Sequence, residues 1–355
     1  MRGSAGARRT EHLFVLSVLR GPGRLRPLRV CRLPRSDVTQ SGGLPGWRSG
    51  LRRAGKLLLG AGGLVQITPS DATLGAVVTG VDLTRLDDAV FAEIESAWHR
   101  YAVLVFEGQD PSTEAQLAFS RRIGRLERGL VKSSTRLLAH ISNTLKNGDV
   151  ADPASLQVRF NEGNQHWHSD SSYKRVGAKA SLLCARVVPD TGGETEWADM
   201  RAAFDALDED MKAYLEGKEA VHSFVFSHTW HGGQELLAEE DIAGLPPVEH
   251  SIVKVHPATG RRSLFVGRHA SHIIGEPVAE SRELLEALTR QACQPPRTFK
   301  HRWRVGDLGL WDNRCVLHRG HPWPMDQARD MVRTTVAGDD PDNEWAEDAA
   351  PGLAG

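Results

Sequence analysis

Residues 307–318 read DLGLWDNRCVLH, two short apolar runs on either side of the polar turn formed by residues 312–314. The same pattern, a short apolar run ended by Gly, Pro or Asp, recurs along the chain. It is found at residues 181–187, 221–226, 252–255 and 263–266. Short strands at this spacing are typical of a β-sandwich or a β-barrel. The sequence therefore predicts a mainly β fold.

Helical segments interrupt and flank these strands. Phe91, Ile94, Trp98 and Tyr101 recur at the spacing of one helix face, and Pro111 is placed to open a second helix. The helices are expected at 91–101, 111–122, 200–215 and 279–292. We read one domain over residues 64–340, with a β core and helices outside it, and a flexible C-terminal tail over 341–355.

The first 63 residues differ in composition from the rest of the chain. They hold twelve Arg and one Lys against Glu11 and Asp37, a net charge of +11, so the remaining residues carry −12. Such a segment fits an organellar transit peptide, a nucleic-acid-binding arm or a translation start assigned too far upstream. We favour the last interpretation, and in each case we expect residues 1–63 to be a disordered extension.

Composition bounds the class of protein. At 355 residues, with 40% hydrophobic and 25% charged residues, the chain is long and apolar enough to bury a core, and it lacks the apolar run of a membrane span. Cys31, Cys184, Cys293 and Cys315 are far apart, which argues against a disulfide framework and favours the cytoplasm. We expect a small-molecule partner, with neither nucleic acid nor a membrane; the oligomeric state stays open, a homo-oligomer included.

One segment suggests a metal site. In 164–170, NQHWHSD, residues His168 and Asp170 are two apart, so on an extended chain both face one side. Two imidazoles and one carboxylate with open positions suit Fe(II), and His318 is a candidate for the third ligand. Among 15 His and 45 acidic residues, however, a His-x-Asp pattern also arises by chance.

A resemblance strengthens this interpretation. The stretch 166–207, with its WHSDSS block and GGETE turn, resembles the taurine dioxygenase family, and within it the 2,4-dichlorophenoxyacetate dioxygenase branch. Residues 266–272 and 311–320 match as well, so that the likeness covers about 64–340. It implies a double-stranded β-helix (jelly roll) core with flanking α-helices, and Fe(II) held by His168, Asp170 and His318.

The same resemblance assigns binding residues for the co-substrate 2-oxoglutarate and for the substrate. Thr195 and Arg329 match the family's 2-oxoglutarate contacts, and a planar guanidinium can grip a carboxylate through two hydrogen bonds. Arg333 and Asn164 match substrate contacts, of which Arg333 would hold the acidic group. Lys132, which matches a lysine of the phenoxyacetate branch, and His222, which precedes an apolar strand, are further substrate-binding candidates.

The activity implied is hydroxylation of a carbon of a small anionic substrate with Fe(II), 2-oxoglutarate and O2, supported by ascorbate. An aryloxyalkanoate-type acid would lose its ether link and give a phenol and an oxo-acid. A taurine, sulfonate or alkyl sulfate substrate is the alternative. Two rival classes, a zinc hydrolase and a non-catalytic jelly-roll binding module, need neither Thr195 nor Arg329.

Overall fold

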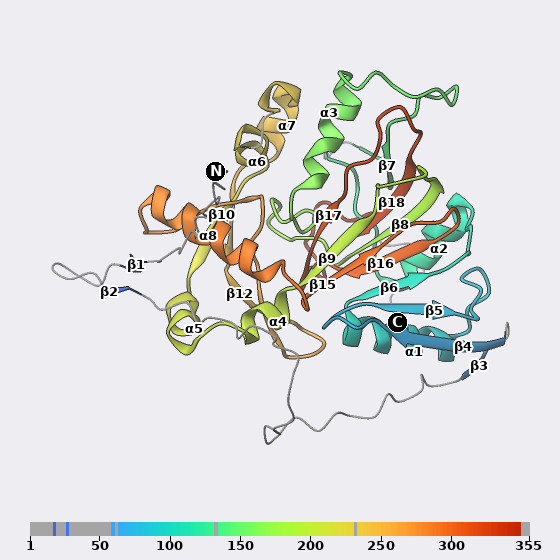
Figure 1. Cartoon of the computed structure of the whole chain (residues 1–355), viewed down its shortest axis with the longest axis horizontal. Helices are drawn as coiled ribbons and strands as arrows, with labels where there is room; N and C mark the ends of the chain where they lie inside the picture. Colours follow the sequence, from blue (N-terminus) through green and yellow to red (C-terminus); the bar gives the residue numbers. More distant parts are fainter. Residues whose placement is uncertain are drawn as a thin grey trace, which may run out of the picture. The chain divides into compact units, whose positions relative to one another are not determined.

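The computed structural model describes residues 63–130, 134–230 and 233–348, together with three short strands nearer the N-terminus. The chain forms two compact units, Met1–Arg53 and Ala54–Gly355. In the first unit, β1 (Ser17–Val18) pairs antiparallel with β2 (Arg26–Pro27). The rest of the fold belongs to the second unit (Figure 1).

An eight-stranded sheet dominates the second unit. Its order is β3-β4-β5-β6-β16-β8-β18-β7, and every pair is antiparallel except β5 with β6. The strands are β3 (Leu58–Gly60), β4 (Gly63–Pro69), β5 (Ala76–Thr79), β6 (Val103–Phe106), β7 (Leu138–Ser142), β8 (Ala180–Val187), β16 (Leu308–Asp312) and β18 (Asp330–Val336). The central strands β6 and β16 are buried throughout, as the apolar runs VLVF and LGLW predict.

A second, three-stranded sheet has the order β15-β9-β17, with β15 at Thr298–His301, β9 at Thr195–Asp199 and β17 at Val316–Gly320. Its Trp197 is fully buried, and the Trp197 ring centroid lies 5.9 Å from that of Trp311 on β16. This contact is part of a buried cluster with members from both sheets. The mainly β fold with helices is thus confirmed.

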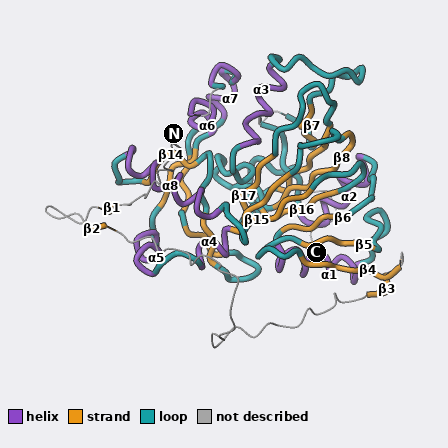
Figure 2. The backbone as a smooth tube through the Cα atoms, in the orientation of Figure 1, coloured by secondary structure: helices purple, strands orange, loops and turns teal. Residues whose placement is uncertain are grey.

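A further group of elements lies on the other side of the three-stranded sheet, away from the large sheet (Figure 2). It contains the strands β10 (Glu219–His222), β11 (Val248–Ser251), β12 (Val253–Val255), β13 (Arg262–Leu264) and β14 (Ala270–Ile273). Its helices are α4 (Met200–Asp205), α5 (Glu209–Leu215), α6 (Phe224–Trp230), α7 (Glu239–Gly244) and α8 (Val278–Ala292), with a 3₁₀ turn η2 (Gln234–Leu236). The helices expected near 200–215 and 279–292 are therefore present as α4 with α5 and as α8.

The remaining helices follow local signals in the sequence. Helix α1 (Asp88–Tyr101) begins after Asp87, whose carboxylate accepts the Val90 amide, and α2 (Thr113–Ile123) begins after Ser112 in the same way. Helix α3 (Leu156–Glu162) runs into the 3₁₀ turn η1 (Gly163–Gln165), which leads directly to the HWHSD segment.

Two expectations differ from the structure. The apolar run 221–226 does not form one strand: β10 ends at His222, and Ser223 begins α6 by accepting the Phe226 amide on its hydroxyl. The predicted tail is packed over residues 341–348. There Trp345 is buried under the Lys174 ammonium, and its carbonyl accepts the Arg128 amide at 2.7 Å.

Among the described residues, no helix has both the length and the apolar character needed to span a bilayer.

We predict that a chain beginning at Gly62 keeps its activity and its thermal stability. Strand β3 is a three-residue edge strand, paired with β4 alone, so its loss removes few contacts. The expected fall in Tm is less than about 4 °C, the change for roughly 1 kcal/mol in a domain of this size. Thermal unfolding of the two chains checks this. Cooperative unfolding of the shortened chain at room temperature would contradict it.

Candidate metal centre and active site

Backbone pairing brings two distant segments together at the site. The His168 amide donates to the His318 carbonyl at 3.0 Å, and the His318 amide donates to the His168 carbonyl at 2.8 Å. His168 follows η1, whereas His318 is the central residue of β17. This isolated bridge fixes the two imidazoles side by side, with ring centroids 4.1 Å apart.

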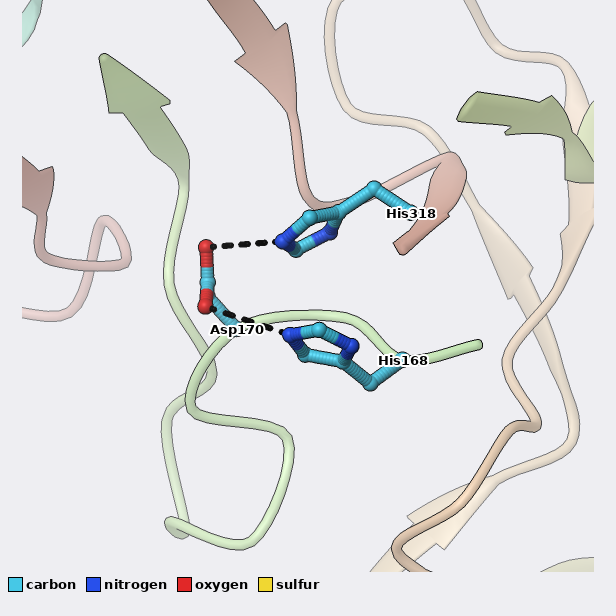
Figure 3. Close-up of side chains that lie close together, drawn as sticks. All are labelled: His168, Asp170 and His318. Carbon is cyan, nitrogen blue, oxygen red and sulfur yellow. Dashed lines mark ion pairs between the residues drawn. The ribbon is translucent and has the colours of Figure 1, made fainter. Parts of the chain in front are cut away.

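Asp170 faces both imidazoles (Figure 3). Its carboxylate oxygens lie 3.9 Å from His168 Nε2 and 3.6 Å from His318 Nε2. One nitrogen or oxygen from each of the three residues lies within 4.8 Å of those of the other two, and all three side chains are buried. The three residues therefore form a compact donor set of two nitrogens and one carboxylate.

The protonation of the donor set suits a divalent cation. Burial lowers the pKa of His168 well below its usual value and that of His318 to about 4. Burial alone would raise the pKa of Asp170, but the Arg333 guanidinium and the two histidines outweigh it and hold this pKa well below its usual range. At neutral pH the site presents two neutral imidazoles and a carboxylate, the forms that bind metal without losing a proton.

Neighbouring groups orient these donors. The His166 carbonyl lies 2.7 Å from His168 Nδ1, which makes that nitrogen the protonated one and leaves the Nε2 lone pair toward Asp170. The indole of Trp311 packs against the His318 ring, with centroids 4.7 Å apart. Such support is what a fixed metal site requires.

A buried polar network holds Asp170. Ser181 donates to Asp170 Oδ2 at 2.6 Å and accepts from the Asn313 amide at 2.9 Å. Asn313 in turn accepts from the Asp170 backbone amide and from the Trp311 indole. Neither Ser181 nor Asn313 was predicted as a site residue from the sequence. The only available signal was the position of Asn313 in the turn of the 307–318 segment.

Arg333 also contacts the donor set. Its NH1 donates to Asp170 Oδ1 at 2.6 Å, an ion pair with the carboxylate. Its backbone belongs to β18, where Arg333 pairs with Leu183 on one side and Ala139 on the other. Arg333, which is expected to hold the substrate's acidic group, therefore also pairs with the predicted metal ligand Asp170.

Thr195 and Arg329 lie together at the GGETE turn. Thr195 begins β9 opposite Gly320, and its hydroxyl oxygen accepts from the Trp303 indole at 3.0 Å, which leaves the hydroxyl hydrogen free to donate. Arg329 donates through Nε and NH2 to the Gly193 carbonyl at 3.3 and 3.1 Å.

The surroundings of Arg329 favour an anion. Its side chain is only 4% exposed, and no carboxylate of the described part of the chain lies within 4.0 Å of it. Burial lowers the pKa of Arg329 to about 10, so the group is still cationic at neutral pH. A buried cation without an anion is costly, and a bound carboxylate would offset that cost.

A cavity of about 530 Å³ opens beside the donor set. His168, Asp170, Asn164 and Arg333 are among the residues that line it, so two predicted substrate contacts share one cavity with two of the predicted metal ligands. Much of the wall is apolar, with Leu130, Leu137, Leu138, Ile141, Phe160, Tyr173 and Phe224. The rest of the wall is polar and includes several basic side chains, and a volume of this size is typical of a small-molecule site.

Lys132 and His222 are the two remaining candidates for substrate binding. Lys132 lies outside the described residues, between Leu130 and Ser134. His222 is fully buried and is not a lining residue. Its ring stacks on that of Phe265, with centroids 5.2 Å apart and a 19° tilt, and meets His250 edge-on.

A second group of possible metal donors is formed by His256, Asp312 and Cys315. Here the Asp312 carboxylate is already shared between His256 Nε2, at 2.8 Å, and the Arg314 guanidinium, at 2.7 and 2.8 Å. The positive charge of Arg314, beside the same carboxylate, disfavours the binding of a metal ion to this group. We interpret this group as a structural ion-pair network below the end of β16.

The comparison with known families settles the class of protein. The sequence model described as "Taurine catabolism dioxygenase TauD, TfdA family" matches residues 66–335. The chain belongs to this family. It is therefore a dioxygenase, and the resemblance inferred from the WHSDSS and GGETE segments is confirmed.

Individual relatives within the family share most of the chain. An (S)-phenoxypropionate/alpha-ketoglutarate-dioxygenase of Sphingobium herbicidovorans is 46% identical over 280 residues, covering 77% of this chain and 95% of that protein. An alpha-ketoglutarate-dependent 2,4-dichlorophenoxyacetate dioxygenase of Cupriavidus pinatubonensis is 42% identical, covering 78% and 98%. The crystal structure of AAD-2 in complex with Mn(II) and N-oxalylglycine is 40% identical, with a TM-score of 0.73 over 80% of this chain and 99% of that one.

The buried histidines predict a pH dependence of stability. Burial lowers the pKa of His250 to about 4 and that of His222 well below its usual value, so both are neutral in the folded protein. The unfolded chain protonates them below about pH 6.5 and takes up more protons, so the free energy of unfolding falls as pH drops from 6.5 toward 4. Each such histidine contributes up to about 1.4 kcal/mol per pH unit.

Urea denaturation at pH 6.5 and 5.5 measures this dependence in the parent protein and in His222→Phe. The variant keeps an aromatic ring against Phe265 but cannot take up a proton. We expect its loss of stability over this interval to be smaller by about 1 kcal/mol. Equal losses in the two proteins would show that His222 takes up a proton in the folded protein as readily as in the unfolded chain.

Proposed function

We propose that this protein is an Fe(II)- and 2-oxoglutarate-dependent dioxygenase that hydroxylates a carbon of a small acid, with aryloxyalkanoates as the favoured class. The observation that supports it most is the buried set of His168, Asp170 and His318 beside a cavity whose wall combines apolar and cationic side chains. We also propose that the two facing sheets form the double-stranded β-helix (jelly roll) implied by the family.

The donor set fits Fe(II). Two neutral imidazoles and one carboxylate leave coordination positions for 2-oxoglutarate and O2, as in the facial triads of non-haem iron oxygenases. When bound, Fe(II) would supply the activation of O2 that turns 2-oxoglutarate into succinate and CO2 and adds the second oxygen atom to the substrate carbon. Ascorbate would support the reaction by keeping the iron reduced.

We assign Thr195 and Arg329 to 2-oxoglutarate. The free hydroxyl hydrogen of Thr195 can donate to one carboxylate, and the buried guanidinium of Arg329 can pair with the other. This assignment accounts for a cation that has no carboxylate partner among the described residues. It also accounts for Gly193, where a Cβ would come within 3.0 Å of Arg329 Nε.

We assign the 530 Å³ cavity to the primary substrate. Its apolar wall would hold an aromatic ring, while Arg333 and Asn164 would contact the polar end of the substrate. Lys132 and His222 stay candidates from the sequence alone. If the hydroxylated carbon carries an ether oxygen, the resulting hemiacetal collapses to a phenol and an oxo-acid, which requires no further catalytic group.

The proposal also covers the cellular compartment of the protein and its binding partners. Cys184, Cys293 and Cys315 are free thiols, all buried, and a reducing cytoplasm keeps thiols in this form. We propose a cytoplasmic enzyme whose partner is a small anionic molecule rather than nucleic acid or a membrane.

Succinate release with Fe(II), 2-oxoglutarate and ascorbate tests the function over a panel of acids. We expect phenoxypropionate- and phenoxyacetate-type acids to give phenol and succinate in equal amounts. Sulfite or sulfate release from taurine or an alkyl sulfate would instead assign the sulfonate alternative. Hydrolysis of an ester with Zn(II) and no oxygen uptake would overturn the proposal in favour of a zinc hydrolase. Acid binding without oxygen uptake or hydrolysis would mark a binding module.

A further inference from the structure

The basic side chains that line the 530 Å³ cavity differ in whether a carboxylate neutralises them. Arg333 pairs with Asp170 at 2.6 Å, Lys174 with Glu127 at 2.7 Å, and Arg128 with Asp348 at 2.8 Å. Two other lining arginines have no ion pair with any carboxylate in the described part of the chain: Arg136, which is exposed, and Arg268, which is half-buried. The charge of Arg268 is therefore available to a ligand.

The contacts of Arg268 leave most of its donors unused. NH1 donates to the Gly163 carbonyl, and NH2 lies 3.5 Å from the Ser227 hydroxyl, at the limit of a hydrogen bond. Nε is buried and has no hydrogen-bond partner. A guanidinium carries five N–H donors, so several donors of Arg268 have no acceptor among the described protein atoms.

The charge of Arg268 persists although the residue is half-buried. Burial lowers the pKa of Arg268 to about 10, which leaves the guanidinium cationic at neutral pH. A half-buried cation that meets only neutral oxygens loses part of its hydration without gaining an ion pair. An anion bound in the cavity would compensate for the lost hydration of the guanidinium.

The backbone fixes Arg268 next to the metal donors. Its amide donates to the Trp167 carbonyl at 2.9 Å, directly before His168. Gly267 makes this approach possible, because its φ is +113° and a Cβ there would come 3.0 Å from the Trp167 carbonyl oxygen. Gly163 leaves the room for the guanidinium, since a Cβ at that residue would overlap NH1.

Arg268 also separates two hollows. It lines both the 530 Å³ cavity and a neighbouring cavity of about 220 Å³ bounded by Phe160, Gly163 and His228. Its guanidinium is thus part of the wall at the end of the substrate cavity formed by η1 and α6.

We propose that Arg268 is a second anion-binding residue of the substrate cavity, one that contacts the carboxylate of the bound acid and makes the enzyme prefer acids to neutral analogues. The proposal rests on the function proposed above. It differs from the assignment of Arg333, because Arg333 divides its charge between Asp170 and the ligand whereas Arg268 has no competing carboxylate.

The test compares an acid substrate from the panel with its primary amide, in the parent enzyme and in Arg268→Gln. Loss of a charged partner of the carboxylate inside the cavity should raise KM for the acid at least about tenfold. KM for the amide and the decarboxylation of 2-oxoglutarate without substrate should change less than about twofold. Arg268→Lys should restore part of the acid affinity, since lysine keeps the charge and loses the fork.

Arg282→Gln is the matched control. Arg282 is also half-buried with a buried Nε that lacks a hydrogen-bond partner, but it stacks on Trp230, at 4.0 Å, and lines neither cavity. This variant should leave both KM values unchanged. Calorimetric titration of the enzyme with the acid gives a readout that does not depend on turnover, and should show the same loss of affinity in Arg268→Gln only.

Two results would overturn the inference. Equal increases in KM for acid and amide would mean that Arg268 supports the cavity wall, and unchanged acid affinity would mean that it does not meet the carboxylate. Failure of the proposed function looks different: the parent enzyme itself would release no succinate with any acid, whatever the behaviour of the variants.

Discussion

Replacement of His168 by alanine is expected to abolish Fe(II) binding and turnover while the chain stays folded. The donor set has only three side chains, and the remaining pair, Asp170 and His318, would offer one nitrogen and one carboxylate. The backbone bonds between residues 168 and 318 do not involve the imidazole, so the bridge that joins the two segments should survive.

Iron content after anaerobic loading, circular dichroism and succinate release together measure this effect. We expect one iron per chain in the parent protein, almost none in His168→Ala, and turnover lowered by at least about a thousandfold, the scale on which loss of an essential catalytic group is felt. Cys315→Ala is the control, because Cys315 belongs to the other group of possible donors. Stoichiometric iron in His168→Ala together with its loss in Cys315→Ala would move the metal to His256 and Asp312.

Arg329→Gln is expected to weaken 2-oxoglutarate at least tenfold. Truncating one partner of a buried, charge-assisted pair costs about 2–5 kcal/mol, and about 1.4 kcal/mol is already a tenfold change. The apparent KM for 2-oxoglutarate should rise accordingly, and decarboxylation of 2-oxoglutarate measured without substrate should slow. Arg329→Lys should be only a partial rescue, because lysine lacks the planar fork.

Arg333→Gln provides the contrast. It should weaken the acid substrate and leave the apparent KM for 2-oxoglutarate within about threefold of the parent value, well below the tenfold step that roughly 1.4 kcal/mol gives. It should also raise the pKa of Asp170, because the Arg333 guanidinium is the strongest influence that holds this pKa down. If Arg333→Gln stopped the substrate-free decarboxylation and Arg329→Gln spared it, the two roles would be exchanged.

Much of the candidate site could be predicted because its residues are close in sequence or carry a motif. The i, i+2 spacing of His168 and Asp170 places both on one side of an extended segment. Matching His318 to them required the resemblance, since no local pattern tells which late strand pairs with residue 168. The structure brings the three together, while their role as iron ligands stays a prediction.

Other features depend on tertiary contacts that leave no local pattern. Ser181 is an ordinary residue at the start of an apolar strand, and only the fold places its hydroxyl on the Asp170 carboxylate. Arg268 stands among many arginines, and its lack of a carboxylate partner appears only when its neighbours are known. The run 221–226 has a strand-like composition throughout, yet the capping hydroxyl of Ser223 begins a helix there.

The paired backbones of His168 and His318 have a consequence for handling the enzyme. In small zinc domains the ion itself organises the chain, and a chelator unfolds them. Here two peptide hydrogen bonds, at 2.8 and 3.0 Å, already hold the ligand-bearing segments in register, so the entropy of assembling the site is lost during folding and not during metal uptake. The enzyme should therefore stay folded during storage without iron and should regain iron when it is added. Exchange of one divalent ion for another should depend on the concentrations of the two ions and should not require the chain to refold.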